Sequence, residues 1–356
     1  MTIHRSLLVR SALGAVGVGV LLASARIASA EEAAVPSAEP APVATPAATV
    51  VPAVPVTEAP PESVDTAPPP AAAKPKPPPY SLPWQLRPVG PGNVLRLDTS
   101  FGFYKNPATD KSGSALATSL LGSYKIIPDL ALIGRVGLVH NSPPDAPAPA
   151  PQSATSILNP VVGGLYGIKL SPSLKLGLFL GFALPVGTGG GTNPDANKMA
   201  ANGVGILTRS AFDNAMFAVN YFTVFPGIDF AYVAHNLTVQ VEATVLRLTK
   251  VRGPDTIDHA NTNFTAGLHV GYFIIPMLSL GAELRHQRWL STPNAVGKDA
   301  THASRDVSTF AIGPRLHFKL SETIWFRPGV SLTLPIDDPM KKAEYKVVQL
   351  DLPFSF

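Results

Sequence analysis

The sequence has no cysteine among its 356 residues, and only 15% of its residues are charged. Without cysteine there can be no disulfide, no thiolate metal ligand, no catalytic thiol and no lipid-modified cysteine after export. Long apolar runs are also scarce, because no segment after Ala30 approaches the ~18 consecutive apolar residues of a transmembrane helix. Mean hydropathy is nevertheless positive. The apolar residues must therefore follow some pattern other than helical spans.

The first residues have the parts of a secretory signal peptide. Arg5 and Arg10 precede or flank an apolar stretch of roughly 14 residues, and small residues end it at Ala28 and Ala30. We predict that residues 1–30 are a cleaved signal peptide that exports the chain.

Residues 31–92 consist mainly of alanine, proline, valine, threonine and glutamate. Such a tract cannot bury a core, and proline favours polyproline-II conformation. We predict a disordered Pro/Ala-rich periplasmic linker. The alternative is an arm that contacts peptidoglycan through lysines such as Lys74 and Lys76.

From residue 93 to residue 356, apolar side chains alternate with small or polar ones. In 174–184, six large apolar residues alternate with residues that include Gly177 and Gly181. In a soluble sandwich, the face opposite the apolar one carries charged and polar residues rather than glycines. Apolar side chains toward lipid and small or polar ones toward a lumen are typical of membrane barrels.

Short and long connections alternate strictly along this region. The short connections lie near 126–129, 170–173, 233–236, 274–277 and 320–323, and the long ones near 105–113, 141–156, 187–225, 251–261, 291–305 and 336–343. This alternation is typical of barrels with periplasmic turns and external loops. The sequence therefore predicts an all-β fold, a transmembrane antiparallel up-and-down β-barrel of about 12 strands, over residues 93–356.

The C-terminal segment 348–356 ends in an aromatic residue and alternates throughout. With the secretory leader, it resembles bacterial outer-membrane β-barrel proteins of the porin-like superfamily. The resemblance implies that Leu350, Leu352, Phe354 and Phe356 form the signal that barrel assembly machinery reads. It also implies outer-membrane localisation, contact with outer-membrane lipid and a passive pore for small solutes. Pro353 departs from the pattern, because proline removes a ladder donor, and Pro160, Pro314 and Pro328 raise the same difficulty.

Strand parity places a set of charged or polar side chains in the lumen: Arg96, Asp98, Arg135, Asp229, Gln240, Glu242, Glu283, Arg285, Arg315, His317, Arg327 and Asp351. They could line a pore and set its selectivity, or pair across the lumen and close it. We favour the pore, because lumenal glycines are expected to leave space unfilled.

The longest connection, 187–225, contains a candidate helix. Asp195 can cap it, and Ile206, Arg209, Asp213 and Phe217 have helical spacing. If this loop folds inward, Arg209 and Asp213 are candidate constriction charges. An external loop is the alternative.

Catalysis has little support in the sequence. His140 and Ser142 are similar to the histidine and serine of outer-membrane phospholipase A, but Pro143 follows at once and the candidate orienting residue Asn159 has no recognisable context. We therefore expect no enzyme, no catalytic residue, no cofactor and no metal. The net charge of +4 is small, and no nucleic-acid partner is expected. The prediction is a monomeric pore; the alternatives are a closed structural barrel that anchors a periplasmic arm or displays external loops, and a lipid hydrolase.

Overall fold

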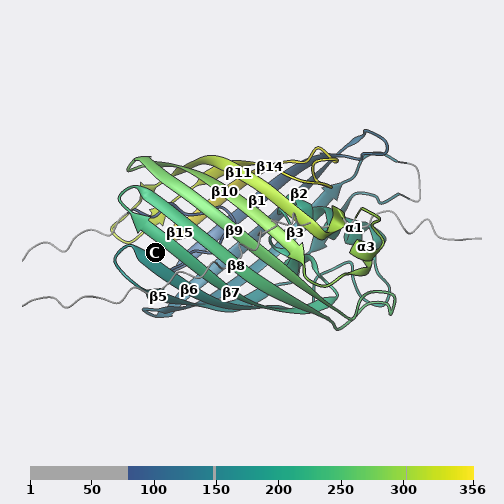
Figure 1. Ribbon diagram of the computed structural model, residues 1–356, viewed down its shortest axis with the longest axis horizontal. Helices are drawn as coiled ribbons and strands as arrows, with labels where there is room; N and C mark the ends of the chain where they lie inside the picture. Colours follow the sequence, from purple (N-terminus) through teal and green to yellow (C-terminus); the bar gives the residue numbers. More distant parts are fainter. Residues whose placement is uncertain (1–78, 147–149, 302) are drawn as a thin grey trace, which may run out of the picture. The chain divides into compact units, whose positions relative to one another are not determined.

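A computed structural model describes residues 79–146, 150–301 and 303–356. In this part of the chain, twelve wall strands form a closed antiparallel barrel, and β1 pairs with both β2 and β15. The strands run obliquely to the long axis of the barrel (Figure 1). The expected fold class is thus confirmed. The signal peptide and residues 31–78 of the linker lie outside the described residues and stay predictions.

The wall is built from strands of about the length that crosses an outer membrane at a tilt. Their bounds are β1 Val94–Lys105, β2 Ser112–Ile127, β3 Leu130–Ser142, β4 Ala154–Ile157 with β5 Val161–Lys169, β6 Leu174–Ala183, β7 Tyr221–Ala234, β8 Leu237–Lys250, β9 Ala260–Ile275, β10 Leu278–Trp289, β11 Asp306–Leu316 with β12 Phe318–Lys319, β13 Trp325–Phe326 with β14 Gly329–Pro335, and β15 Lys346–Ser355. The helical elements are α1 Ala196–Thr208, α2 Asn214–Phe217, α3 Asn294–Gly297 and the 3-10 turn η1 Ala303–Arg305.

The four prolines that the sequence places within predicted strands have different effects on the wall. Pro160 lies between β4 and β5, and Pro328 lies between β13 and β14, because proline cannot donate to the ladder. Pro314 stays within β11 opposite Leu280, and Pro353 stays within β15 opposite Arg96. Two of the four prolines therefore break a strand.

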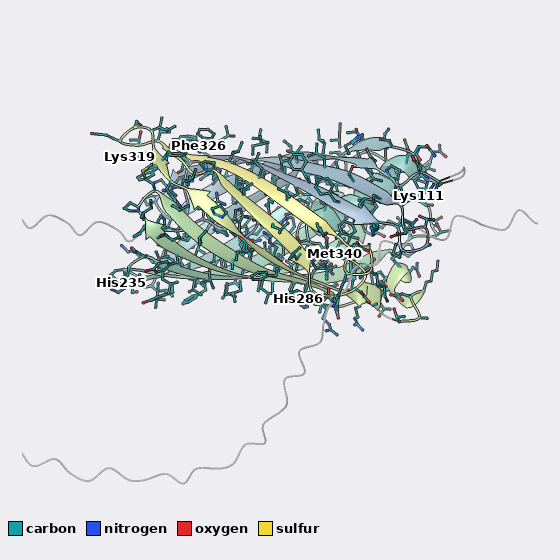
Figure 2. The ribbon with its side chains drawn as sticks, turned by 90° about the horizontal axis from the view of Figure 1, so that it is seen from above. Lys111, His235, His286, Lys319, Phe326 and Met340 are labelled. Carbon is teal, nitrogen blue, oxygen red and sulfur yellow. The ribbon has the colours of Figure 1, made fainter. Side chains whose placement is uncertain are left out.

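The two ends of the barrel differ. Tight turns such as the one at His235 join neighbouring strands at one end, and the long connections that carry α1 and α3 lie at the other (Figure 1). In Figure 2, His235 and Lys319 mark the turn end, whereas Lys111 and Met340 mark the loop end. The predicted alternation of short and long connections is therefore present.

The outer face of the wall is apolar. On β3, Leu132 and Val136 are 53% and 54% exposed, whereas Ala131 and Ile133, on either side of Leu132, are buried. A soluble monomer rarely exposes an apolar patch larger than a few hundred Å². We therefore treat this face as lipid-facing. Among the described residues, no helix is both long enough and apolar enough to cross a bilayer.

The inner face is less uniform than the sequence suggested. One sector carries a buried apolar cluster that includes Ile133, Leu165, Phe179, Phe225 and Leu246. The lumen is therefore lined by large apolar side chains as well as by small and polar ones. These apolar groups are buried because segments other than the wall also occupy the lumen.

Candidate functional site

The lumen is filled in part by residues 79–92, which the sequence assigned to the periplasmic linker. Trp84 is 1% exposed and Leu86 is fully buried. The segment leads into β1 at Val94, so it lies on the turn side of the first strand. Residues 79–92 therefore belong with the barrel and not with the predicted linker, because this stretch buries large apolar side chains in the lumen.

A signal for this segment is present in the sequence. Tyr80, Leu82, Trp84 and Leu86 alternate with smaller or polar residues, directly after the proline run, and Trp84 is one of only three tryptophans. Proline content concealed this pattern.

Side chains of the wall hold the backbone of this segment. The Arg315 Nε donates to the Leu82 carbonyl at 3.0 Å, and the Gln349 Nε2 donates to the Trp84 carbonyl at 3.1 Å. Arg96 also donates to the Trp84 carbonyl. Backbone carbonyl groups of residues 79–92 thus find hydrogen-bond partners in the lumen, although the segment does not pair with a strand of the wall.

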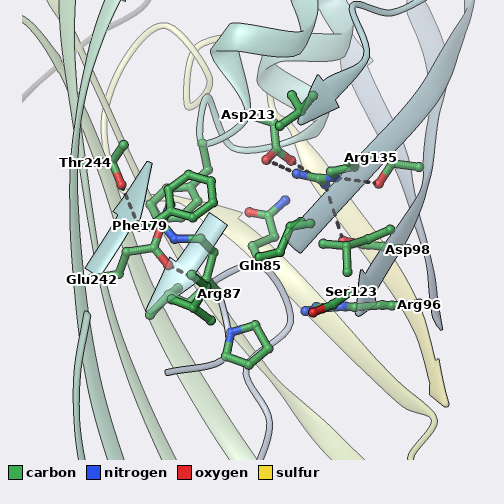
Figure 3. A pocket seen from close by; sticks show the side chains of 18 of the residues that line it. Gln85, Arg87, Arg96, Asp98, Ser123, Arg135, Phe179, Asp213, Glu242 and Thr244 are labelled. Atoms are coloured by element: carbon green, nitrogen blue, oxygen red, sulfur yellow. Dashed lines mark hydrogen bonds and ion pairs between the residues drawn. The ribbon is translucent and has the colours of Figure 1, made fainter. Parts of the chain in front are cut away.

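Arg87 carries the charge of this segment into the wall (Figure 3). Its Nη1 lies 2.9 Å from Glu242 Oε1, and its Nη2 lies 3.4 Å from Asp229 Oδ1. Its guanidinium carbon lies 4.3 Å from the centre of the Phe179 ring. Asp229 and Glu242 are paired in register on β7 and β8, so one arginine forms ion pairs with two adjacent buried carboxylates.

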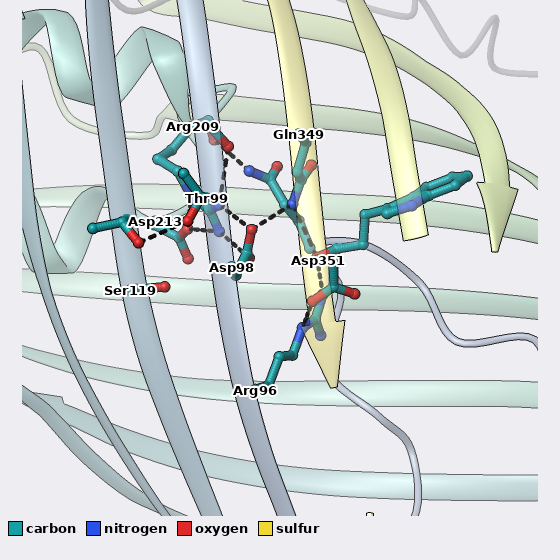
Figure 4. A network of polar contacts seen from close by, with 12 residues as sticks. Arg96, Asp98, Thr99, Ser119, Arg209, Asp213, Gln349 and Asp351 are labelled. Carbon is teal, nitrogen blue, oxygen red and sulfur yellow. Dashed lines mark hydrogen bonds and ion pairs between the residues drawn. The ribbon is translucent and has the colours of Figure 1, made fainter. Parts of the chain in front are cut away.

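A second network anchors the long connection between β6 and β7 (Figure 4). Arg209 donates to both oxygens of Asp98 on β1 at 2.7 Å, and its Nε donates to Asp213 at 2.8 Å. Arg135 on β3 donates to Asp213 at 3.0 Å, and Gln349 on β15 donates to Asp98 at 2.9 Å. The inward placement of this loop is therefore what the structure shows, and Arg209 is only 3% exposed.

The helix in this connection begins where the sequence indicated. Asp195 caps α1 by accepting hydrogen bonds from the backbone N–H groups of Asn197 and Lys198. These hydrogen bonds, first that from Lys198, hold the pKa of the Asp195 carboxyl below its usual range.

The expected helical spacing from Ile206 to Phe217 was wrong. α1 ends at Thr208, and the chain reverses at Ser210 and Ala211, whose φ angles are +56° and +52°. This reversal lets Arg209 reach Asp98 and Asp213 together.

Five of the remaining charged residues predicted for the lumen form further pairs. Asp351 accepts from Arg96 Nε at 2.6 Å and from Arg315. Glu283 accepts from Arg285 Nε at 2.8 Å. Every carboxylate among the predicted set has a guanidinium partner in the described structure.

The three other predicted residues also lie on the lumenal side. Gln240 is fully buried and accepts from the Tyr80 hydroxyl, His317 lies 2.9 Å from the Ser279 hydroxyl, and the Arg327 guanidinium lies 5.2 Å from the centre of the Trp325 ring. The structure therefore brings the predicted set into the lumen, while a role in selectivity stays a prediction.

A cavity of about 100 Å³ remains between residues 79–92 and the wall (Figure 3). Apolar side chains such as Leu165 and Phe225 line one side, and Arg96, Asp98 and Arg135 line the other. A space of this size admits water molecules but not a large solute. The expectation that lumenal glycines leave open space was wrong here.

The glycines instead make room for residues 79–92. A Cβ on Gly267 would lie 2.7 Å from Leu86 Cδ1, and a Cβ on Gly281 would lie 2.9 Å from Trp84 Cη2. Both distances are too short for an unshifted neighbour. The wall is thus recessed at these positions to accept the segment.

The outer-wall residues considered for catalysis form a partial arrangement. His140 Nε2 lies 3.3 Å from the Ser142 hydroxyl, but its Nδ1 lies 2.9 Å from the Thr155 hydroxyl. Asn159 points inward instead, where its amide donates to the Ala218 carbonyl at 2.9 Å. Asn159 therefore does not orient His140, and the geometry gives no support to a lipid hydrolase.

The C-terminal strand β15 presents every second side chain to the outer face of the wall. Leu350, Phe354 and Phe356 are exposed on the outer face and Leu352 is half-buried there, as alternation requires. Their recognition by the barrel assembly machinery stays a prediction.

Over residues 79–146, 150–301 and 303–356, no group of three or more acidic or histidine side chains is positioned to hold a metal ion.

No protein-family model matches this sequence, and a comparison with curated proteins finds no match. Solved structures with a similar fold include an outer membrane channel from Pseudomonas putida F1, with 12% identity, a TM-score of 0.49, and coverage of 78% of this chain and 100% of that chain. The KdgM porin, solved with disordered oligogalacturonate, has 11% identity, a TM-score of 0.40 and coverage of 74% and 99%. The translocator domain of autotransporter NalP from Neisseria meningitidis has 8% identity, a TM-score of 0.39 and coverage of 77% and 90%. These neighbours are bacterial outer-membrane barrel proteins, and the likeness at such identities concerns the fold of the wall.

Proposed function

We propose that this protein is a passive pore for small solutes in the outer membrane of a Gram-negative bacterium, described here in a closed state. The observation that carries the proposal is the way the lumen is closed. Two segments outside the wall, residues 79–92 and the connection that contains Arg209, occupy the lumen through polar contacts. The wall itself keeps a lumen wide enough to contain both.

Opening requires that residues 79–92 leave. Their neutral hydrogen bonds each contribute about 0.5–1.5 kcal/mol net, and those to charged groups such as Glu242 and Glu283 about 1.5–3 kcal/mol, since water replaces the partner on both sides. Departure of Arg87 would leave Asp229 and Glu242 facing water in the lumen, so the open pore would favour cations. The same proposal places the N-terminal arm in the periplasm, where it contacts peptidoglycan. It takes the protein to be a monomer whose partners are outer-membrane lipid and the barrel assembly machinery.

Planar-bilayer recording tests the pore directly. The full chain should be silent or open briefly, whereas a chain that lacks residues 79–92 should give steady stepwise conductance. The control is electrophoresis with and without heating, because a folded barrel resists detergent until it is heated. Silence from both chains, each shown to be folded, would contradict the pore.

The filled lumen also favours a second candidate, a closed structural barrel that anchors a periplasmic arm or displays external loops. Here residues 79–92 would be permanent core rather than a removable occupant. That candidate expects the deletion to lower stability without producing conductance.

A further inference from the structure

The wall recognises residues 81–87 chiefly through their backbone. Four carbonyl groups, those of Leu82, Pro83, Trp84 and Arg87, accept hydrogen bonds from side chains of the wall. Four N–H groups donate in the other direction, to Thr238, to Glu283 twice and to Glu242. Because backbone groups are common to all peptides, this pattern fits an extended peptide in general.

Two side chains of the segment then occupy shaped positions. Trp84 is 1% exposed and lies edge-on to His269, with ring centres 5.9 Å apart. Gly281 and Gly329 flank it, and a Cβ at either would lie within 3.0 Å of the indole. The wall therefore contains a slot for a large aromatic side chain.

The second position takes a cation three residues later. Asp229 and Glu242 are buried, and Arg87 is the basic residue paired with both in the described structure. The Thr244 hydroxyl accepts from Arg87 Nη2 at 2.8 Å. A guanidinium fits this cradle better than an ammonium, because it reaches three acceptors with one planar group.

We propose that the lumen is a binding site for a short extended peptide that carries an aromatic residue and, three residues later, an arginine. Residues 79–92 are the occupant that the chain supplies itself, and a separate peptide of the same chemistry replaces it. The inference rests on the proposed pore for the route by which such a peptide reaches the lumen. The experiment below measures peptide binding, whereas the pore is tested by conductance, so either proposal can fail without the other.

The test uses the full chain with Trp84→Ala and Arg87→Ala, which weakens the internal occupant. A fluorescently labelled synthetic peptide with the sequence of residues 79–92 is added to the protein in detergent, and anisotropy is measured. Tight saturable binding is expected for this variant. Binding to the unchanged chain should be weaker by at least about tenfold, because the tethered segment competes at an effective concentration on the order of millimolar.

Matched variants locate the binding. Adding Gly281→Val to the variant chain fills the aromatic slot and should abolish binding. Gly122→Val adds the same side chain at a glycine whose Cβ would meet nothing within 4 Å, and should leave binding intact. A peptide with alanine at the Trp84 and Arg87 positions should bind at least about tenfold more weakly, since buried Trp and Arg dominate such contacts.

A second measurement leaves Trp84 and Arg87 of the occupant unchanged. Ser81 is 1% exposed, and Ser81→Cys supplies the single thiol of the chain. Excess peptide should accelerate maleimide labelling of this thiol by displacing the segment. The proposal is overturned if the folded variant shows no saturable binding, if Gly281→Val binds as well as Gly122→Val, or if labelling of Ser81→Cys is unchanged at millimolar peptide. Conductance without peptide binding would remove this inference alone, and peptide binding without conductance would remove the pore.

Discussion

The two segments that fill the lumen are held in different ways. The connection with α1 and α2 is joined to the wall at both ends, by β6 and β7, and its Arg209 chelates Asp98 with both terminal nitrogens. Residues 79–92 are joined to the wall only through β1, among the described residues, and are held by hydrogen bonds to their backbone and by the ion pairs of Arg87 with Asp229 and Glu242.

This difference assigns the two segments different roles in a pore. A segment fixed at both ends by buried ion pairs narrows the lumen permanently, because breaking one partner leaves a buried charge. A segment tethered at one end can leave while its contacts exchange with water. In the proposed pore, residues 79–92 are therefore the removable part, and the α1 connection is the constriction that stays.

The largest effect is expected when residues 79–92 are cross-linked to the wall, because the proposed pore then cannot open. The Ser81 and Ser279 hydroxyls lie 3.2 Å apart, so Ser81→Cys with Ser279→Cys should form a disulfide with little movement. Under oxidation, all openings in bilayer recordings should disappear, and a reductant should restore them. Each single-cysteine chain is the control and should be insensitive to both reagents. Openings that persist in the cross-linked chain would mean that residues 79–92 do not gate the lumen.

Arg209→Ala tests the fixed segment. Asp98 would lose its bidentate partner in a buried site, and unfolding by guanidinium chloride in detergent should show a loss of about 3 kcal/mol. Arg247→Ala removes an exposed arginine of the wall and should stay within about 0.5 kcal/mol of the unchanged chain. Equal losses for the two variants would show that the Arg209 network does not anchor the loop.

Arg87→Ala is the corresponding change in the removable segment. It removes hydrogen bonds to charged groups that contribute about 1.5–3 kcal/mol each, so the open fraction should rise by about tenfold or more. The reversal potential should also shift toward cation selectivity, because Asp229 and Glu242 lose their partner. An unchanged open fraction in single-channel records would place the segment among the permanent parts of the barrel.

The comparison also explains what the sequence could predict. The wall follows from local alternation, because each strand pairs with its neighbour and every second residue must suit lipid; parity alone therefore placed Arg96, Asp98 and Glu283 in the lumen. The pairing of those charges depends on groups far along the chain. Trp84 bonds to Glu283, 199 residues away, and Arg209 bonds to Asp98, 111 residues away. No local period records such contacts, and for this reason the inward fold of the loop remained open and residues 79–92 were assigned to the linker.

The smallest expected effect concerns the cap of α1, at the exposed end of the fixed segment. The pKa of Asp195 lies below its ordinary value of 3.8, so its stabilisation of α1 is complete above pH 3.8 and is lost as the pH falls through the lowered value. Asp195→Ala should therefore lower the amide protection factors at Asn197 and Lys198 near neutral pH and abolish the further loss of protection in acid. Lys198→Ala is the control, because the ion pair of 3.3 Å between Lys198 Nζ and Asp195 is exposed and contributes little. The Arg209 network lies at the other end of the helix, so protection of the Arg209 amide should not change in either variant; a loss there would mean that the cap, rather than the buried ion pairs, holds the loop in the lumen.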